Sequence, residues 1–144
     1  MLPTLYGRIQ TRLFLILGIG GLWAVVISPL LPLGGALGDK YRAMYSLLLV
    51  VAVLGVLWEF LYHGLQQFRW EKDWPTLFGL LVGIPEGVVA FAVARTGVLP
   101  AAEHVSGVAF VVGFGTTWFV TWLFVNGPMR VLSVHWRFRG GRLI

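Results

Sequence analysis

The sequence has no cysteine and few charged residues. Disulfides, thiolate metal ligands and cysteine nucleophiles are therefore excluded throughout its 144 residues. Charged residues make up 12% of the chain, against ~25% in a typical soluble domain, whereas 58% of the chain is hydrophobic. A soluble surface needs more charge than this to stay dispersed. The composition excludes an ordinary soluble domain, a disordered tail and a fibrous repeat, and it predicts a polytopic membrane protein.

The sequence also lacks the common catalytic motifs of soluble enzymes. We find no Ser-His-Asp pattern, no phosphate-binding glycine loop and no metalloprotease motif. The connections between the apolar segments are too short to hold a soluble domain. We therefore do not expect an enzyme, and a catalytic site would have to lie within the membrane.

Four segments are long and apolar enough to span a bilayer, which takes ~20 residues. They cover residues 13–33, 43–65, 76–94 and 105–125. The first is longer than the ~7–15-residue core of a signal peptide, so we expect it to be retained. Pro128 ends the last, because proline cannot continue a helix. These spans predict a single domain over residues 1–144, an all-α antiparallel four-helix bundle with short loops.

Lysine and arginine are unevenly divided between the two ends of this predicted bundle. With four spans, the end that holds both termini carries eight of them and the other end carries three. The eight are Arg8, Arg12, Arg69, Lys72, Arg130, Arg137, Arg139 and Arg142, and the three are Lys40, Arg42 and Arg95. Positive residues are enriched on the cytoplasmic side of membrane proteins. We therefore expect both termini in the cytoplasm, and the membrane to be the cytoplasmic (inner) membrane of a prokaryote.

Residues 129–144 form a basic tail. Apolar and basic side chains alternate between Val134 and Arg139, which predicts an extended segment on the membrane surface rather than a helix. We expect four of its arginines to contact anionic lipid headgroups, because the guanidinium group suits phosphate. These are Arg130, Arg137, Arg139 and Arg142. The net charge of +5 is thus explained by the membrane surface, and no nucleic-acid partner is expected.

Small residues form a row on the third span. A spacing of four residues between glycines gives small-xxx-small motifs, which let helices pack closely. We define the glycine seam as this row with its counterpart on the second span: Gly55, Gly79, Gly83, Gly87 and Ala90. At 100° per residue, Glu86 emerges from the seam rather than facing lipid.

Three polar residues within the second and third spans are expected to meet. Asp73, as an N-cap, and Pro75, in the first turn of the third span, predict a tight hairpin between the two spans. Glu59 and His63 are four residues apart and share one face of the second span. The hairpin brings this face beside Glu86 of its neighbour. The sequence thus predicts a buried polar cluster of Glu59, His63 and Glu86.

Three interpretations of this cluster remain open. In a structural role, the acids are protonated, or paired with a cation such as protonated His63, and hold the helices in register. In a transport role, the carboxylates and the histidine relay protons or cations. In a metal or pigment site, His63 is a ligand and Glu59 a second one, although their spacing differs from the Glu-x-x-His of di-iron bundles. No cofactor is strongly implied.

The function predicted from these features is that of a small accessory, structural or assembly subunit of a larger membrane complex. Four short helices leave little room for a pathway inside one protomer, and the partners we expect are other membrane subunits. The alternative is a homo-oligomeric proton- or cation-coupled transporter or channel that uses Glu59, His63 and Glu86.

Overall fold

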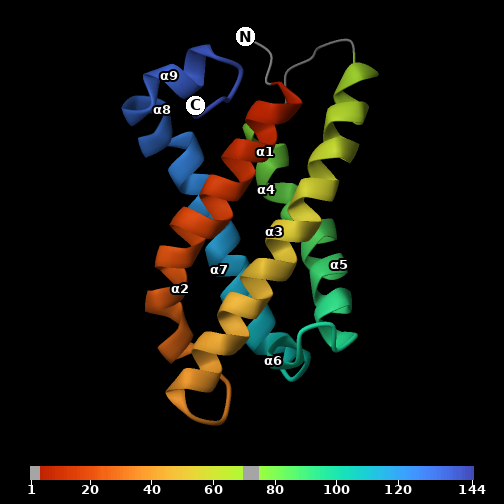
Figure 1. Ribbon diagram of the computed structural model, residues 1–144, viewed down its shortest axis with the longest axis vertical. Coiled ribbons are helices and arrows are strands. Elements are labelled where there is room, and N and C mark those ends of the chain that lie inside the picture. Colours follow the sequence, from red (N-terminus) through yellow and green to blue (C-terminus); the bar gives the residue numbers. More distant parts are fainter. Residues whose placement is uncertain (1–3, 70–74) are drawn as a thin grey trace.

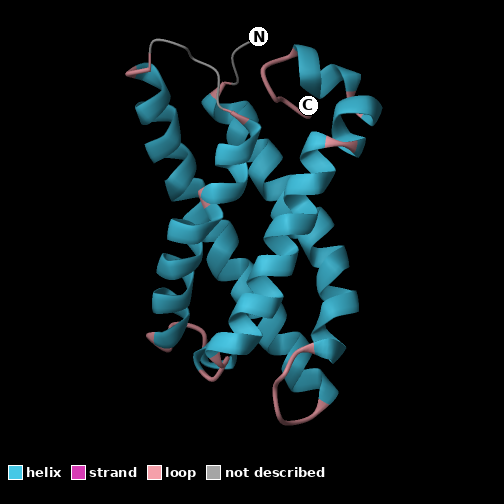
Figure 2. Ribbon diagram, turned by 180° about the vertical axis from the view of Figure 1, so that it is seen from behind, coloured by secondary structure: helices cyan, strands magenta, loops and turns pink. Residues whose placement is uncertain are grey.

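The computed structural model describes residues 4–69 and 75–144, which form helices without strands (Figures 1 and 2). Four helical segments, Leu5–Leu30, Leu37–Gln67, Thr76–Arg95 and Gly107–Leu132, are long and apolar enough to cross a membrane. Their elements are α1 (Leu5–Leu13), the π-helical segment η1 (Phe14–Gly20), α2 (Gly21–Ile27), the 3₁₀ turn η2 (Ser28–Leu30), α3 (Leu37–Gln67), α4 (Thr76–Leu81), α5 (Gly83–Arg95), α6 (Pro100–Glu103), α7 (Gly107–Asn126), α8 (Pro128–Leu132) and α9 (Val134–Phe138).

The first candidate span begins earlier than the sequence predicts. Thr4 is its N-cap, since the Thr4 side chain accepts a hydrogen bond of 3.1 Å from the Gly7 amide. Arg8 and Arg12 therefore lie inside α1 and not in a flanking segment. The predicted span is an uncharged run and therefore begins only after Arg12. A helix can continue through a charged residue if the side chain of that residue is paired. This correction brings two arginines into the interior.

The third candidate span is divided into two helices. Pro85 has no N–H to donate to the carbonyl four residues before it, and the chain changes from α4 to α5 at Val82. The N-cap residue of α4 is Pro75. The predicted capping residue Asp73 and the basic residue Lys72 lie outside the described residues.

The chain after α7 is helical, so the predicted extended tail was wrong. α7 ends at Asn126, as the sequence predicts, and Pro128 opens α8. The alternating run of six residues is too short to distinguish a strand from one turn of helix. Beyond α9 the chain turns back at Gly140, which has a φ of 64°, and its carbonyl accepts a 3.0 Å hydrogen bond from the Thr4 amide. The C-terminal segment is thereby attached to the start of α1.

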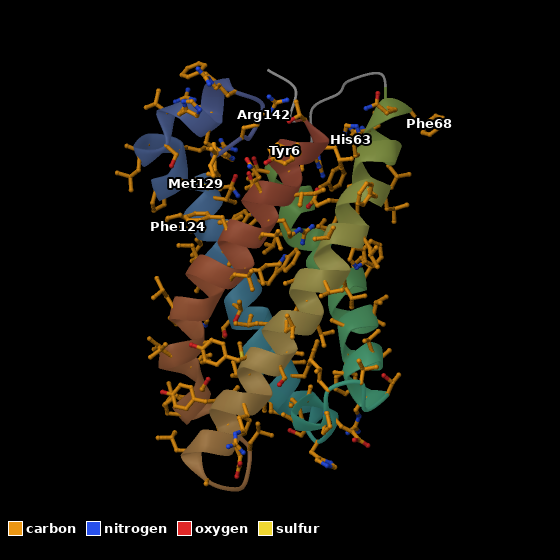
Figure 3. All side chains as sticks on the ribbon, viewed as in Figure 1. Tyr6, His63, Phe68, Phe124, Met129 and Arg142 are labelled. Carbon is orange, nitrogen blue, oxygen red and sulfur yellow. The ribbon has the colours of Figure 1, made fainter. Side chains whose placement is uncertain are left out.

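The interior is apolar at the end opposite the termini, and the outer surface is apolar along every candidate span. Both termini lie at the upper end in Figure 1. Large apolar side chains point outward on all four spans (Figure 3), for example Leu22 (69% exposed), Leu57 (62%), Ile84 (67%) and Val111 (67%). An outer surface of this kind suits lipid rather than water.

Candidate functional site

Two arginines of α1 point toward α3. Arg8 and Arg12 are four residues apart, so they share one face of the helix. Gly55 of α3 lies opposite the stem of Arg12, where an added Cβ would be 3.2 Å from the Arg12 Cδ. The glycine therefore leaves the room that the arginine stem occupies.

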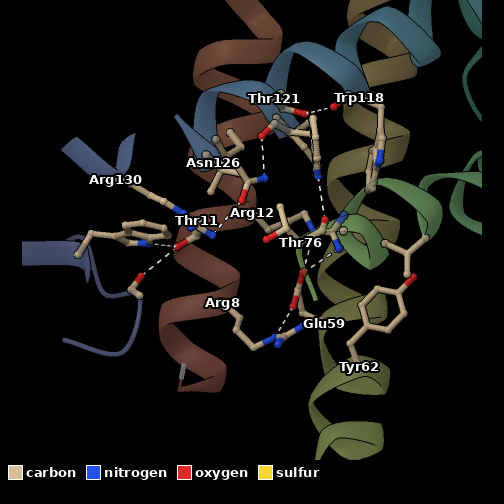
Figure 4. A pocket seen from close by; sticks show the side chains of 18 of the residues that line it. Arg8, Thr11, Arg12, Glu59, Tyr62, Thr76, Trp118, Thr121, Asn126 and Arg130 are labelled. Carbon is tan, nitrogen blue, oxygen red and sulfur yellow. Dashed lines mark hydrogen bonds and ion pairs between the residues drawn. The ribbon is translucent and has the colours of Figure 1, made fainter. Parts of the chain in front are cut away.

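These arginines bind the two buried glutamates and form what we call the arginine–glutamate network: Arg8, Arg12, Glu59 and Glu86. Arg12 donates from Nε to Glu59 Oε1 at 2.8 Å, and from Nη1 and Nη2 to the two oxygens of Glu86 at 2.8 and 3.0 Å. Arg8 donates from Nε to Glu59 Oε2 at 2.7 Å (Figure 4). All four carboxylate oxygens thus accept a charge-assisted hydrogen bond, and one guanidinium joins α1 to both α3 and α5.

The network is deeply buried and its four charges cancel. Glu59 is 6% and Glu86 2% exposed, and an unpaired carboxylate at such positions would be costly. Two guanidinium groups balance two carboxylates within the chain, in geometries that match the planar fork of arginine. The arginines therefore neutralise the two carboxylates. The sequence alone assigns this neutralisation to protonation of the acids or to a protonated His63.

Other polar and aromatic side chains surround the network. Arg8 Nη1 donates to Gln66 Oε1 at 2.8 Å. The Arg12 guanidinium lies 5.4 Å from the ring centre of Trp118, within the range of a cation–π interaction. These contacts fix the orientation of both guanidinium groups.

The structure does not bring His63 into this network. Its Nδ1 is buried without a hydrogen-bond partner in the described part of the chain. Across residues 4–69 and 75–144, no three histidine, aspartate or glutamate side chains come together as they would to hold a metal ion. Glu59 and Glu86 of the predicted polar cluster do come together, through Arg12.

The glycine seam of α4 and α5 contacts aromatic side chains of α7. The pairs run in opposite directions along the two segments: Gly79 with Trp122, Gly83 with Trp118 and Gly87 with Phe114. An added Cβ would lie 3.6 Å from Trp122 at Gly79, but 2.6 Å from Trp118 Cδ1 at Gly83 and 2.8 Å from Phe114 at Gly87. The Trp118 and Trp122 indoles also donate hydrogen bonds to the carbonyls of Leu80 and Thr76. Three glycines of the seam therefore receive aromatic rings of α7, and Ala90, its last member, is buried.

A cavity of about 350 Å³ lies beside the network, near the end where the start of α1 meets the C-terminal segment. Figure 4 shows the side chains that line it. We call it the terminal cavity. It is an open cavity, lined by residues of α1, η1, α3, α4 and α7 and by Arg130, Trp136 and Gly141 of the C-terminal region. Arg8, Arg12 and Glu59 reach its wall, and Glu86 is not among its lining residues.

The four tail arginines are exposed on the outside of this same end. Arg130 lies on α8, Arg137 on α9, and Arg139 and Arg142 on the segment that follows. Only Arg130 of the four borders the terminal cavity, and it donates from Nη2 to Asn126 Oδ1 at 3.0 Å.

Sequence reasoning missed the two arginines of the network. The signal was present, because Arg8 and Arg12 have the i, i+4 spacing of one helix face and immediately precede an apolar run. Two acids within apolar segments favour cationic partners nearby, which is a second signal. Comparisons of the chain with protein-family models, curated proteins and solved structures found no match.

Proposed function

We propose that the chain is an integral membrane protein, an antiparallel four-helix bundle with both termini in the cytoplasm, that acts as an accessory or assembly subunit of a larger complex in the cytoplasmic membrane of a prokaryote. The four apolar helical segments and their outward-facing apolar side chains support the membrane placement. The excess of basic residues at the end with both termini supports the orientation.

The observation that carries a structural role is the closure of the arginine–glutamate network. Every carboxylate oxygen of Glu59 and Glu86 already accepts a hydrogen bond from an arginine of the same chain. A proton can reach a carboxylate oxygen of this network only if one of these arginine hydrogen bonds breaks, so the closed network is poorly suited to carry protons. The network therefore acts as a clamp that joins α1, α3 and α5, and the outer helix surfaces are left for partner subunits.

The second candidate is a homo-oligomeric proton- or cation-coupled transporter or channel. One observation favours it: Glu59 reaches the wall of the terminal cavity, which opens a route from that end to the network. In this function, transport requires the Arg12–Glu86 pair to separate, because Arg12 lines the cavity and Glu86 lies beyond its wall.

The tail arginines, in either function, contact anionic lipid headgroups. Arg130, Arg137, Arg139 and Arg142 are exposed at the predicted cytoplasmic end, where each basic residue gains ~1 kcal/mol from the anionic surface. The bilayer is the partner of these side chains, and no nucleic acid is required to explain the charge.

The test is native mass spectrometry after mild extraction from the source membrane. An accessory subunit is expected to be released with the same unrelated membrane chains, at a fixed ratio, whichever chain carries the affinity tag. A symmetric homo-oligomer that conducts protons or cations in vesicles would refute the accessory role and support the second candidate.

A further inference from the structure

The terminal cavity has a positive charge that the described part of the chain does not balance. Arg8, Arg12 and Arg130 line it, against Glu59 as its one acidic lining residue among the described residues. Glu59 and Glu86 together neutralise Arg8 and Arg12. Arg130 has a neutral partner, Asn126, and no carboxylate of the described chain pairs with it. The described wall therefore carries one uncompensated positive charge.

The rest of the wall is largely apolar and lies within the candidate spans. The apolar side chains that line the cavity include those of Trp118, Trp122, Leu15, Val82 and Val125. Hydroxyl groups of Thr11, Thr76 and Thr121 and the Asn126 side chain stand among them. A cavity with one uncompensated basic residue in its wall and an otherwise largely apolar lining fits an amphipathic monoanion better than a free inorganic ion.

The size of the cavity limits what it holds. A volume of about 350 Å³ is near the lower end of the ~300–1,000 Å³ that is usual for ligand pockets. It accommodates a headgroup with part of a glycerol backbone, while longer acyl chains remain outside. Basic pockets between membrane helices on the cytoplasmic side recognise anionic lipid headgroups by the same chemistry.

We propose that the terminal cavity binds the phosphodiester headgroup of a monoanionic phospholipid, with Arg130 as its counter-charge. This inference rests on the proposed membrane placement and goes beyond the surface contacts of the tail, because it assigns one arginine to one cavity. The guanidinium of Arg130 pairs with the phosphate, the indoles of Trp118 and Trp122 contact the glycerol region, and the network forms the polar wall.

The test compares lipids retained by the full chain in nanodiscs that contain equal amounts of phosphatidylcholine and phosphatidylglycerol. Native mass spectrometry after release is expected to show phosphatidylglycerol retained about tenfold over phosphatidylcholine, because both lipids offer a phosphate to Arg130 but the choline cation of phosphatidylcholine cancels the headgroup charge that Arg130 would balance. Arg130→Gln is expected to abolish the preference and Arg130→Lys to keep most of it. Arg130 is exposed, so neither substitution puts folding at risk.

Arg137→Gln is the matched control, because Arg137 is a basic residue of the same tail that does not border the cavity. Its preference should equal that of the parent, and an equal loss in Arg137→Gln and Arg130→Gln would show a diffuse surface effect and overturn the cavity site. A soluble competitor distinguishes a lipid ligand from a free phosphate ester. Glycerol 3-phosphate in large excess should not displace the lipid, and full displacement would overturn the lipid assignment.

The outcomes also separate this inference from the proposed function. Normal incorporation into nanodiscs with equal retention of both lipids would overturn the cavity site alone. Failure of the chain to incorporate into any bilayer would overturn the membrane placement and, with it, the lipid site.

Discussion

The arginine–glutamate network predicts that a second substitution restores part of the stability that a first one removes. Arg12→Met removes a guanidinium that binds one oxygen of Glu59 and both oxygens of Glu86. Glu86, 2% exposed, then has no cation, and the remaining three members carry a net charge of −1. Changing Glu86→Gln in addition restores neutrality, because Arg8 and Glu59 then balance each other. The double variant should therefore be more stable than the single one.

The magnitude follows from the burial of the abandoned carboxylate. Removing one partner of a buried ion pair costs about 3–5 kcal/mol of unfolding free energy. Arg12 serves two carboxylates, so the upper half of this range applies to Arg12→Met. A neutral buried amide without all of its partners costs about 1–3 kcal/mol. We therefore expect the double variant to recover about 2 kcal/mol relative to the single variant.

The assay is unfolding in mixed micelles with increasing SDS, followed by the helical circular dichroism signal. The control is Arg42→Met, because Arg42 is an exposed arginine whose side chain is 79% exposed and 4.0 Å from Asp39. Exposed pairs of this kind contribute at most about 1 kcal/mol. If Arg12→Met costs no more than Arg42→Met, or if Glu86→Gln adds to its cost, the charges do not act as one network.

Three further predictions address the glycines and the orientation. Gly83→Ala should lower the unfolding free energy by about 1–3 kcal/mol, because the added Cβ overlaps the indole of α7, whereas Gly79→Ala, with 3.6 Å to its nearest neighbour, should be close to neutral in the same SDS titration. Gly7→Ala should detach the C-terminal segment, whose backbone would lie 2.7 Å from the new Cβ, and should speed limited proteolysis of the tail; Gly38→Ala, which has open space, should not. A C-terminal reporter that fluoresces only in the cytoplasm should be bright, and a dark fusion of normal abundance would contradict the proposed orientation.

The sequence predicts the number of apolar spans and the interior place of the two acids, but not their partners. Spans follow from hydropathy, which is a local property, and the place of Glu86 follows from the helical period of the glycine seam. Pairing is not local: Arg12 meets Glu86 across 74 residues, and its side chain fits because Gly55 leaves room. His63 shares the face of Glu59 by periodicity, yet both oxygens of Glu59 are already occupied by arginines.

The ends of the helices were the least predictable feature. The charges of Arg8 and Arg12 placed the start of the predicted first span at residue 13, whereas the helix starts at Leu5 because Thr4 caps it and the glutamates balance its arginines. The alternation near Val134 resembled a strand, but Pro128 and Gly140 confine that segment to two short helices that return to α1. Patterns of a few residues carry too little information to decide such cases.

The contact between the start of α1 and the segment at Gly140 has a consequence for biosynthesis. The Thr4 hydroxyl and its hydrogen-bond acceptor, the Gly140 carbonyl, are separated by 136 residues, so the ribosome produces one long before the other. During that interval the first helix has to be kept in register by its arginines, which meet Glu59 and Glu86 earlier in synthesis. The C-terminal segment then packs against a helix that is already in place, so the last residues to be synthesised complete the contact with the first helix.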